Sequence, residues 1–536
     1  MKKSAKKIAK KIALHASLWG LALLGLTSCS EDFLTIYPTS QVAAGAPATQ
    51  DIIDQQLVSA YQILLLDSYA DGNLVSIITF GDVRSDDLYK GGENLGDQVA
   101  VYRHSQYTVT ADNQLDGYWG IYYTGLQRCN AALLSCSNAE GVPPSILNRL
   151  RAEALTLRAY YIHHLWKAFG NIPYYEETPG PPYYTAPQYT AEQIYAEIIE
   201  DLDAAIATED LPLATTAANA GRINKAAAMM TKARAVMYQK DEARYAEVLA
   251  DMKTIIESGQ YDLIRTSPDA KLTANPITWM FLREGEFCKE SIFEANHLPE
   301  GKSWGNSWSG YGNYLPKCAA PRDLNDPTKT FDAGWGMFTV QRGTFERIFN
   351  EAGDVRKEAS VIEWPSSAYD YEGSFQVTGL FMGKYAARTG YNKNTTGDAA
   401  LNYENNMRIF RLAETYLNAA ELSFYAGGAG AAQPYLDAIR ARAFGDNAHA
   451  ITATLENIKL ERHRELFGEG QRFWDLVRWG RDETGKTTAQ VLSVTDVAFH
   501  MDRTWEDYKK YLPLPKAEID KTKGTEHELA QNPGWN

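Results

Sequence analysis

The sequence has few cysteines, no clustered histidines and no excess of positive charge. Its 536 residues include five cysteines, without a C-x-x-C pair, and nine scattered histidines. Only His163 and His164 are adjacent, and neighbouring helical residues point in different directions, so we interpret both as core or surface residues rather than ligands. Because no metal-site spacing is present, we predict neither a metal nor a cofactor.

The cysteines do not form an obvious disulfide framework. Cys129 and Cys136 are seven residues apart in a predicted helix, which separates them by about 10 Å along its axis. That distance is too long for a disulfide, and we interpret both as buried small hydrophobes. Cys288 and Cys318 could pair, although nothing in the sequence requires it.

The N-terminus indicates export and lipidation. MKKSAKKIAKK carries six lysines and no acid, and a short apolar run and Leu26-Thr27-Ser28-Cys29 follow. A basic head, an apolar middle and small residues predict a signal peptide at 1–28. The last four residues resemble the bacterial lipobox, which predicts lipidation of Cys29; the alternative is an ordinary signal with an incidental cysteine. Acyl chains would anchor the protein without a transmembrane helix, and no later run is long enough to span a bilayer.

The mature chain is strongly acidic. Removing residues 1–28 moves the formal net charge from −14 to −20. Phosphate binding requires a basic face, so this charge argues against nucleic acid as a partner. It does not exclude neutral ligands such as sugars.

Apolar residues recur mainly with the period of an α-helix. Ile194, Ile198, Leu202 and Ile206, for example, lie on one helical face. Short turns join several predicted helices into antiparallel pairs of the tetratricopeptide type. We therefore predict a mostly α fold in which such pairs form a scaffold. The predicted helices lie near 51–66, 114–137, 146–169, 191–207, 222–239, 242–257, 406–426, 431–444, 454–467 and 470–480.

Long irregular inserts interrupt this helical pattern. Between about 260 and 405, Gly, Trp, Tyr, Pro and Asn accumulate, and shorter inserts occupy 80–98 and 171–189. A rigid scaffold usually carries its binding residues on such segments. The inserts are therefore expected to form the ligand face.

Several stretches resemble the SusD/RagB family of Bacteroidetes nutrient-uptake lipoproteins, in the family's order and across nearly the whole mature chain. The most specific are ERHRELFGEGQRFWDLVRWG (461–480) and QNPGW (531–535). The others are LRAEALTLRAYYIHHLWKAFGNIPYY (150–175), GRINKAAAMMTKARAVMY (221–238), MRIFRLAETYLNAAEL (407–422) and YLPLPKAEID (511–520).

The resemblance implies a non-catalytic protein that binds a glycan or, in the RagB branch, peptides. It implies a partner, a SusC-like TonB-dependent transporter barrel on which the protein sits as a lid. The acidic stretch after Cys29 resembles a surface-export tag, which implies the exterior of the outer membrane. The resemblance also implies an N-terminal region at 29–220 and a C-terminal region at 221–536, together forming one compact unit.

A carbohydrate binder needs aromatic rings for the C–H faces of the sugar and polar groups for its hydroxyls. The densest supply of both is SWGNSWSGYGNYLP (303–316). We predict ligand contacts for Trp304, Trp308, Tyr311 and Tyr314 there and for Trp335 in FDAGWGMF (331–338). The alternative is that some of these rings pin the loop to the helices beneath. Four tryptophans in predicted helices are expected in the core: Trp119, Trp166, Trp474 and Trp479.

The insert at 80–98 supplies further candidates by its region in the family rather than by a motif. We predict ligand contacts for Arg84, Asp87, Tyr89 and Asn94. Asp86-Asp87 equally resembles a helix-capping or calcium-binding pair.

Three patterns resemble other functions. GRDETGKT (480–487) matches the phosphate-loop pattern, but it follows a predicted helix instead of a buried strand, so we interpret Gly480 as a helix cap. GKSWG (301–305) matches a nucleophile elbow without the required strand and helix. The charged residues of 462–478 are expected to form an ion-pair network. A surface glycan-degrading enzyme, using a pair of its many carboxylates, is the alternative from another functional class.

Overall fold

A computed structural model of the protein describes residues 47–66, 76–115, 117–177, 185–306, 308–364, 374–393 and 395–535. The predicted signal peptide and Cys29 lie outside these residues. Pro47–Asn536 form one compact unit. Among the described helices, none combines the length and the apolar character needed to cross a membrane.

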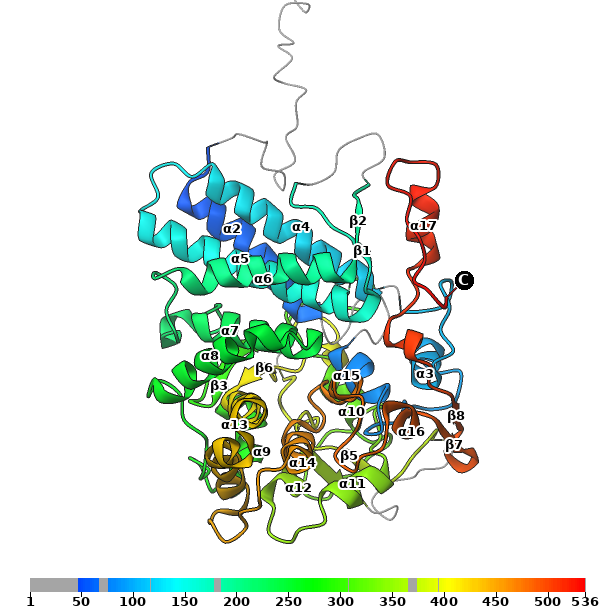
Figure 1. The fold of residues 1–536 in the computed structure, drawn as a ribbon. Coiled ribbons are helices and arrows are strands. Elements are labelled where there is room, and N and C mark those ends of the chain that lie inside the picture. Colours follow the sequence, from blue (N-terminus) through cyan, green and yellow to red (C-terminus); the bar gives the residue numbers. More distant parts are fainter. Residues whose placement is uncertain are drawn as a thin grey trace, which may run out of the picture. The chain divides into compact units, whose positions relative to one another are not determined.

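Helices dominate the described residues, as predicted (Figure 1). The longer helices coincide with the predicted ones to within a few residues, with one exception described below. Their bounds are α2 Gln50–Tyr61, α4 Gly117–Ser137, α5 Pro144–Phe169, α6 Ala191–Ala207, α7 Lys225–Gln239, α8 Tyr245–Glu257, α13 Leu412–Phe444, α14 Leu455–Leu466 and α15 Arg472–Trp479.

Consecutive helices pack against one another, which is the tetratricopeptide-like arrangement. α4 packs on α5, α5 on α6, α6 on α7 and α7 on α8, and α13 then packs on both α8 and α14. In Figure 1, α2, α4, α5 and α6 lie side by side above α7 and α8. The packed faces bury the apolar periodic residues, including Ile194, Ile198 and Leu202 of α6.

The helix predicted at 406–426 is wrong over its first turns. Met407–Arg411 instead form β6, which pairs antiparallel with β3, Ser291–Ala295. All five residues of β6 are buried, Arg408 and Arg411 included, so the segment has no exposed side of the kind that an amphipathic surface helix shows. α13 begins only at Leu412. It breaks where Gly428 adopts a φ of +70°, a backbone conformation that favours glycine, and this break separates the two helices predicted on either side of it.

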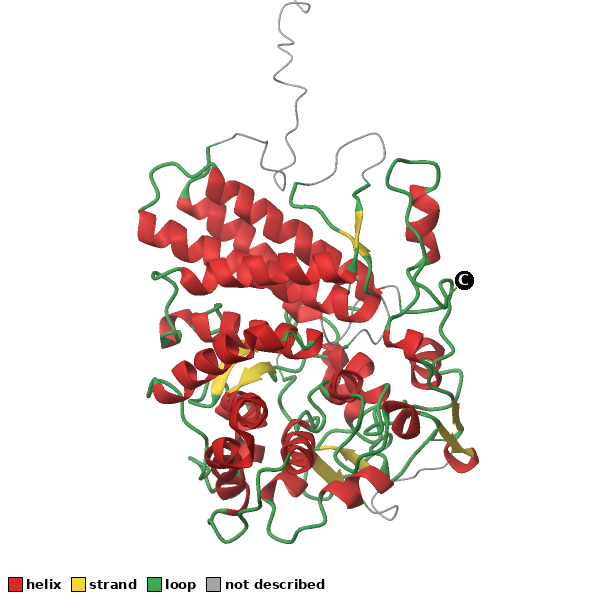
Figure 2. Cartoon of the chain, in the orientation of Figure 1, coloured by secondary structure: helices red, strands yellow, loops and turns green. Residues whose placement is uncertain are grey.

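The insert at 260–405 contains short elements that periodicity could not reveal (Figure 2). They are too short to show several turns of a pattern. The short helices of the protein are α3 Val99–Gln106, α9 Pro276–Phe281, α10 Leu315–Ala319, α11 Arg342–Ile348, α12 Val355–Ser360, α16 Thr488–Leu492 and α17 Lys516–Thr522. The remaining strands form three antiparallel pairs: β1 Ile172–Pro173 with β2 Gln188–Tyr189, β4 Val361–Glu363 with β5 Leu380–Met382, and β7 Val494–Asp496 with β8 Met501–Arg503.

Buried ion pairs join the C-terminal helices to the rest of the fold, as the charge pattern of 462–478 predicts. Arg462 of α14 pairs with Asp475 of α15 at 2.8 Å. Glu465 receives Arg411 of β6 at 2.7 Å and Arg442 of α13 at 2.6 Å. Each of these side chains is almost completely buried, so removing one partner would leave an uncompensated charge in the interior.

Candidate functional site

A thin hairpin, residues 298–314, carries most of the predicted aromatic platform. The backbone N–H of Leu298 donates to the carbonyl of Tyr311 at 3.1 Å, and that of Tyr311 donates to the carbonyl of Glu300 at 2.8 Å. A Cβ atom on Gly310 would lie 2.3 Å from the backbone of Gly301, so the two sides touch only because both residues are glycine. The hairpin therefore holds Trp304 near its tip.

Three of the predicted residues form one aromatic cluster. The Trp304 ring centroid lies 5.8 Å from that of Trp335 and 6.3 Å from that of Tyr314, and the Tyr314 and Trp335 centroids are 4.8 Å apart. Tyr314 is buried, Trp335 is half-buried and Trp304 is 52% exposed. The cluster thus presents Trp304 and part of Trp335 to solvent, supported from beneath by Tyr314. We call these three residues the platform.

Short backbone contacts fix the position of Trp335. Its N–H donates to the carbonyl of Lys317 in α10 at 2.9 Å, and the Lys317 ammonium donates to the carbonyl of Ala333 at 2.6 Å. Gly334 packs so closely on α10 that a Cβ atom there would lie 2.4 Å from the carbonyl oxygen of Ala320. Trp335 is therefore held in place before any ligand arrives, which reduces the entropic cost of binding.

The insert at 80–98 reaches the platform through its second half. The N–H of Gly92 donates to the carbonyl of Gly336 at 2.7 Å, so this loop lies directly beside Trp335. Glu93 forms an ion pair with Arg322 at 3.5 Å, and Asn94 is exposed next to Glu93. Asn94 therefore lies on the loop that borders the platform and remains a candidate for contacting ligand hydroxyls.

Trp308 and Tyr311 lie apart from this cluster. Trp308 is half-buried against the main core, and its carbonyl accepts from the Gln62 amide at 3.4 Å. Tyr311 is 47% exposed, but it lines a separate groove of about 530 Å³ that it shares with Val58 of α2 and with Leu298. The hairpin thus directs its aromatic rings to different places.

The first half of the insert is enclosed by protein. Arg84 is buried, stacks 4.0 Å from the centre of the Phe473 ring and donates to the carbonyl of Lys509 at 2.9 Å. Burial lowers the pKa of Arg84 to about 10. Tyr89 is 7% exposed and stacks on Phe499 with ring centroids 4.9 Å apart. These two residues therefore support the fold in this structure, and we do not carry them into the candidate site.

Asp87 belongs to a buried charged cluster. Its Oδ1 lies 2.6 Å from Nε2 of His463, whose Nδ1 lies 3.1 Å from Glu483. Arg472 donates to Asp86 at 2.8 Å and to Glu483 at 2.9 Å. We call Asp86, Asp87, His463, Arg472 and Glu483 the charged cluster. Arg472 and His463 thus contact the carboxylates of Asp86 and Asp87, and we leave Asp87 out of the candidate site. Neither aspartate caps a helix here.

The pKa values within the charged cluster follow from burial and pairing. Burial and Arg472 oppose a charge on His463, but Asp87 and Glu483 outweigh them and raise its pKa to about 9. Burial also opposes the charge of Asp86, whereas Arg472 lowers its pKa to about 2. For Asp87, burial dominates and raises the pKa. Ligand atoms of Asp86, Asp87 and His463 lie within 4.8 Å of one another, as in metal sites. The guanidinium of Arg472 already supplies the positive charge that a metal ion would bring.

The structure adds residues near the platform that the sequence analysis missed. The carboxylate of Asp398 accepts from the backbone N–H of Trp304 at 3.0 Å. Lys317 and Arg322 lie beneath and beside Trp335. No local motif marks these residues, because each reaches the platform only through the folding of the insert.

Several other predictions are settled by the described residues. Cys129 and Cys136 are buried and unpaired, and Cys288 and Cys318 are not bonded to each other. His163 and His164 are buried in α5, where burial lowers the pKa of both well below the usual value.

The predicted core tryptophans and the motif look-alikes also have clear positions. Trp119, Trp166 and Trp474 are buried, and Trp479 is partly buried. Gly480 ends α15 with a φ of +73°, as expected for a helix cap. Residues 301–305 belong to the hairpin and do not form a strand–turn–helix elbow.

Comparisons with known proteins agree with this architecture. The sequence model of a family described as "SusD family" matches residues 289–535, and one described as "Starch-binding associating with outer membrane" matches residues 32–237. The starch-binding protein SusD of Bacteroides thetaiotaomicron is 22% identical over 449 residues, covering 74% of each chain.

Solved structures are more similar still. The surface glycan-binding protein A from Bacteroides fluxus is 50% identical, with a TM-score of 0.83, covering 91% of this chain and 100% of its own. The surface glycan-binding protein A from Bacteroides thetaiotaomicron, solved in complex with laminarihexaose, is 33% identical, with a TM-score of 0.80, covering 90% of this chain and 100% of its own. Half-identity over nearly the full length, together with the family matches, shows that this chain belongs to the SusD family.

Proposed function

We propose that this chain is a non-catalytic cell-surface glycan-binding protein and that its ligand lies on the platform. The observation that carries the proposal is the exposed ring of Trp304, held against Trp335 and Tyr314. Aromatic rings fixed in this way stack on the C–H faces of sugar rings. The similar proteins named for glycan binding support the same conclusion.

The proposed ligand is a neutral glycan of the laminarin type. Glu93, on the loop beside Trp335, forms an ion pair with Arg322. Because the two charges neutralise each other, this edge of the platform does not favour a charged ligand. The exposed side-chain amide of Asn94 offers its N–H groups as donors to sugar hydroxyls, while its Oδ1 accepts from the backbone N–H groups of Gly96 and Asp97. A relative of 33% identity was solved with laminarihexaose, and a SusD-like protein of 26% identity is described as laminarin binding.

Delivery and location are further parts of the proposal. We infer that lipidated Cys29 anchors the protein at the outer face of the outer membrane and that a SusC-like TonB-dependent transporter receives the glycan. Membership of the SusD family and the match to a family described as associating with the outer membrane support this arrangement. The lipid anchor is tested by metabolic labelling with a radioactive fatty acid, which should mark the native protein and not Cys29→Ser.

The binding proposal is tested by titrating the purified protein with laminarihexaose in a calorimeter. We expect saturable binding and no new reducing ends after prolonged incubation with laminarin. Appearance of reducing ends would instead identify a glycan-degrading enzyme. Binding of oligopeptides from a mixture, without binding of laminarihexaose, would instead identify a peptide-uptake member of the family.

A further inference from the structure

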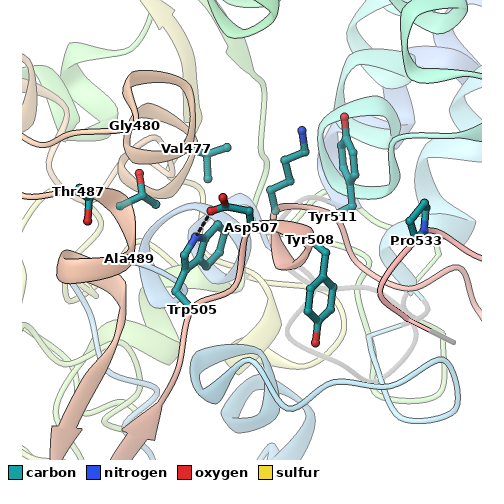
Figure 3. Close-up of a pocket in the computed structure, with 11 residues that line it drawn as sticks. Val477, Gly480, Thr487, Ala489, Trp505, Asp507, Tyr508, Tyr511 and Pro533 are labelled. Atoms are coloured by element: carbon teal, nitrogen blue, oxygen red, sulfur yellow. Dashed lines mark hydrogen bonds between the residues drawn. The ribbon is translucent and has the colours of Figure 1, made fainter.

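A second pocket lies at the C-terminal side of the fold, built from elements that take no part in the platform (Figure 3). It has a volume of about 740 Å³, within the usual range of ligand sites. Its walls come from the end of α15, from α16, and from the segments around 505–511 and 533. The lining includes Gly480, Trp505, Asp507, Tyr508, Lys510 and Tyr511.

Aromatic rings give this pocket apolar surface. Trp505 is nearly buried, and its indole N–H donates to Oδ1 of Asp507 at 3.1 Å, which fixes the carboxylate. Tyr508 and Tyr511 are partly exposed and extend in opposite directions from the same helical turn (Figure 3). The ring of Tyr508 is held edge-on against Trp535, with centroids 5.0 Å apart. The pocket thus combines rigid aromatic groups with an oriented acid.

Its polar groups are available to a ligand. Asp507 and Lys510 are exposed, and neither forms an ion pair with any residue that the structure describes. The Lys510 ammonium lies 4.8 Å from the centre of the Tyr511 ring. Among the described residues, the hydroxyls of Tyr508 and Tyr511 also have no hydrogen-bond partner. One acid, one base and two phenols therefore surround the aromatic surface.

This combination favours an uncharged ligand with many hydroxyls. A carboxylate accepts from a hydroxyl and an ammonium donates to one, so neighbouring sugar hydroxyls can satisfy Asp507 and Lys510 together. A phosphate would meet the carboxylate of Asp507. In the loop that resembles a phosphate loop, a carboxylate of the loop itself takes the position of an anion. The backbone N–H of Lys486 donates to Oδ1 of Asp482 at 2.9 Å. The GRDETGKT segment therefore borders this pocket without forming an anion site.

We propose that this pocket is a second saccharide-binding site, independent of the platform. A protein with two such sites would bind a long polysaccharide at two points. The second contact would raise the overall affinity although the platform itself is unchanged. The inference rests on the proposed function only for the choice of a neutral glycan as probe.

The test is calorimetric titration with laminarihexaose of four proteins, each checked for native thermal unfolding. They are the native protein, Trp304→Ala, the double variant Asp507→Ala/Lys510→Ala, and both changes combined. Lys516→Ala/Asp520→Ala is the matched control, since it also removes one exposed acid and one exposed base from the C-terminal segment. We expect about two equivalents of laminarihexaose to bind the native protein and the control. Trp304→Ala should bind about one equivalent, as should Asp507→Ala/Lys510→Ala, which we call the pocket variant. The combined variant should bind none.

The possible outcomes separate the two proposals. In one outcome, the native protein binds a single equivalent, Trp304→Ala abolishes this binding and the pocket variant leaves it unchanged. This outcome contradicts the second site and supports the platform. Binding that survives Trp304→Ala and disappears only when the pocket is also changed supports the second site, even if the platform is wrong. No binding by the native protein contradicts both.

Discussion

The hairpin at 298–314 and the segment at 82–87 both belong to the inserts predicted to form the ligand face, yet they place their side chains in opposite environments. The hairpin exposes Trp304 on a support of other rings. The segment at 82–87 buries Asp86 and Asp87 against Arg472 and His463. The difference shows that a candidate ligand face keeps part of its aromatic surface exposed to solvent, whereas a charged loop whose side chains are paired and buried serves the fold.

The largest effect is expected from breaking the charged cluster. Arg472→Met leaves Asp86 and Glu483 buried without their main counter-ion, and we expect a loss of about 3–5 kcal/mol in the free energy of unfolding. Equilibrium unfolding in urea measures this loss of stability. Laminarihexaose affinity per folded molecule should not change. A variant that keeps its stability but loses affinity would place the charged cluster in the ligand site.

The pH dependence of stability should come partly from His463. Its pKa in the folded protein, about 9, lies above its ordinary value of about 6.5, so its stabilising charge is complete below about pH 6.5 and is lost as the pH rises through 9. The contribution is on the order of 3 kcal/mol. Urea midpoints measured from pH 6 to 9.5 should fall more steeply for the native protein than for His463→Gln. Parallel pH profiles for the two proteins would contradict the assigned pairing with Asp87 and Glu483.

A smaller loss, in affinity rather than stability, is expected at the platform. Trp304→Ala removes an exposed ring, so the midpoint of thermal unfolding should not change, whereas laminarihexaose affinity should fall by about 2 kcal/mol, or about 30-fold. Trp308→Ala is the comparison, because Trp308 packs on the core and has no ring contact with Trp335 among the described residues. An equal loss of affinity in Trp308→Ala would extend the ligand site along the whole hairpin.

The smallest effect is expected at Lys486, the exposed lysine of the GRDETGKT segment. Lys486→Ala should change the unfolding free energy by less than about 0.5 kcal/mol, as for other exposed positions. It should leave laminarihexaose binding unchanged in the same titration. A marked loss of binding would give this loop a role that its geometry does not show.

The helical scaffold could be predicted from the sequence because each long helix repeats its apolar face over several turns. α6, for example, begins and ends where the periodicity of Ile194 to Ile206 predicts. β6 was mistaken for a helix because Ile409 precedes Leu412 and Ala413 of α13 at the i, i+3, i+4 spacing of a helical face.

The candidate site was only partly predictable. The density of tryptophan, tyrosine and glycine at 303–316 marks an unusual loop, which locates Trp304 and Tyr314. Whether a given polar residue is exposed depends on partners far away in the chain. Asp87 meets His463, and Arg84 meets Lys509, across more than 370 residues. Sequence spacing contains no record of such contacts, so the enclosed half of the insert at 80–98 could not be distinguished from its exposed half.

The position of the ligand tests the central claim most directly. A crystal structure of the protein with laminarihexaose should show a sugar ring stacked on Trp304, with Trp335 beside it and hydroxyls within hydrogen-bond reach of Asn94. A sugar bound in the C-terminal pocket as well would not affect this result. An oligosaccharide bound elsewhere, with the ring of Trp304 still exposed to solvent at saturating ligand, would contradict the assignment of the platform.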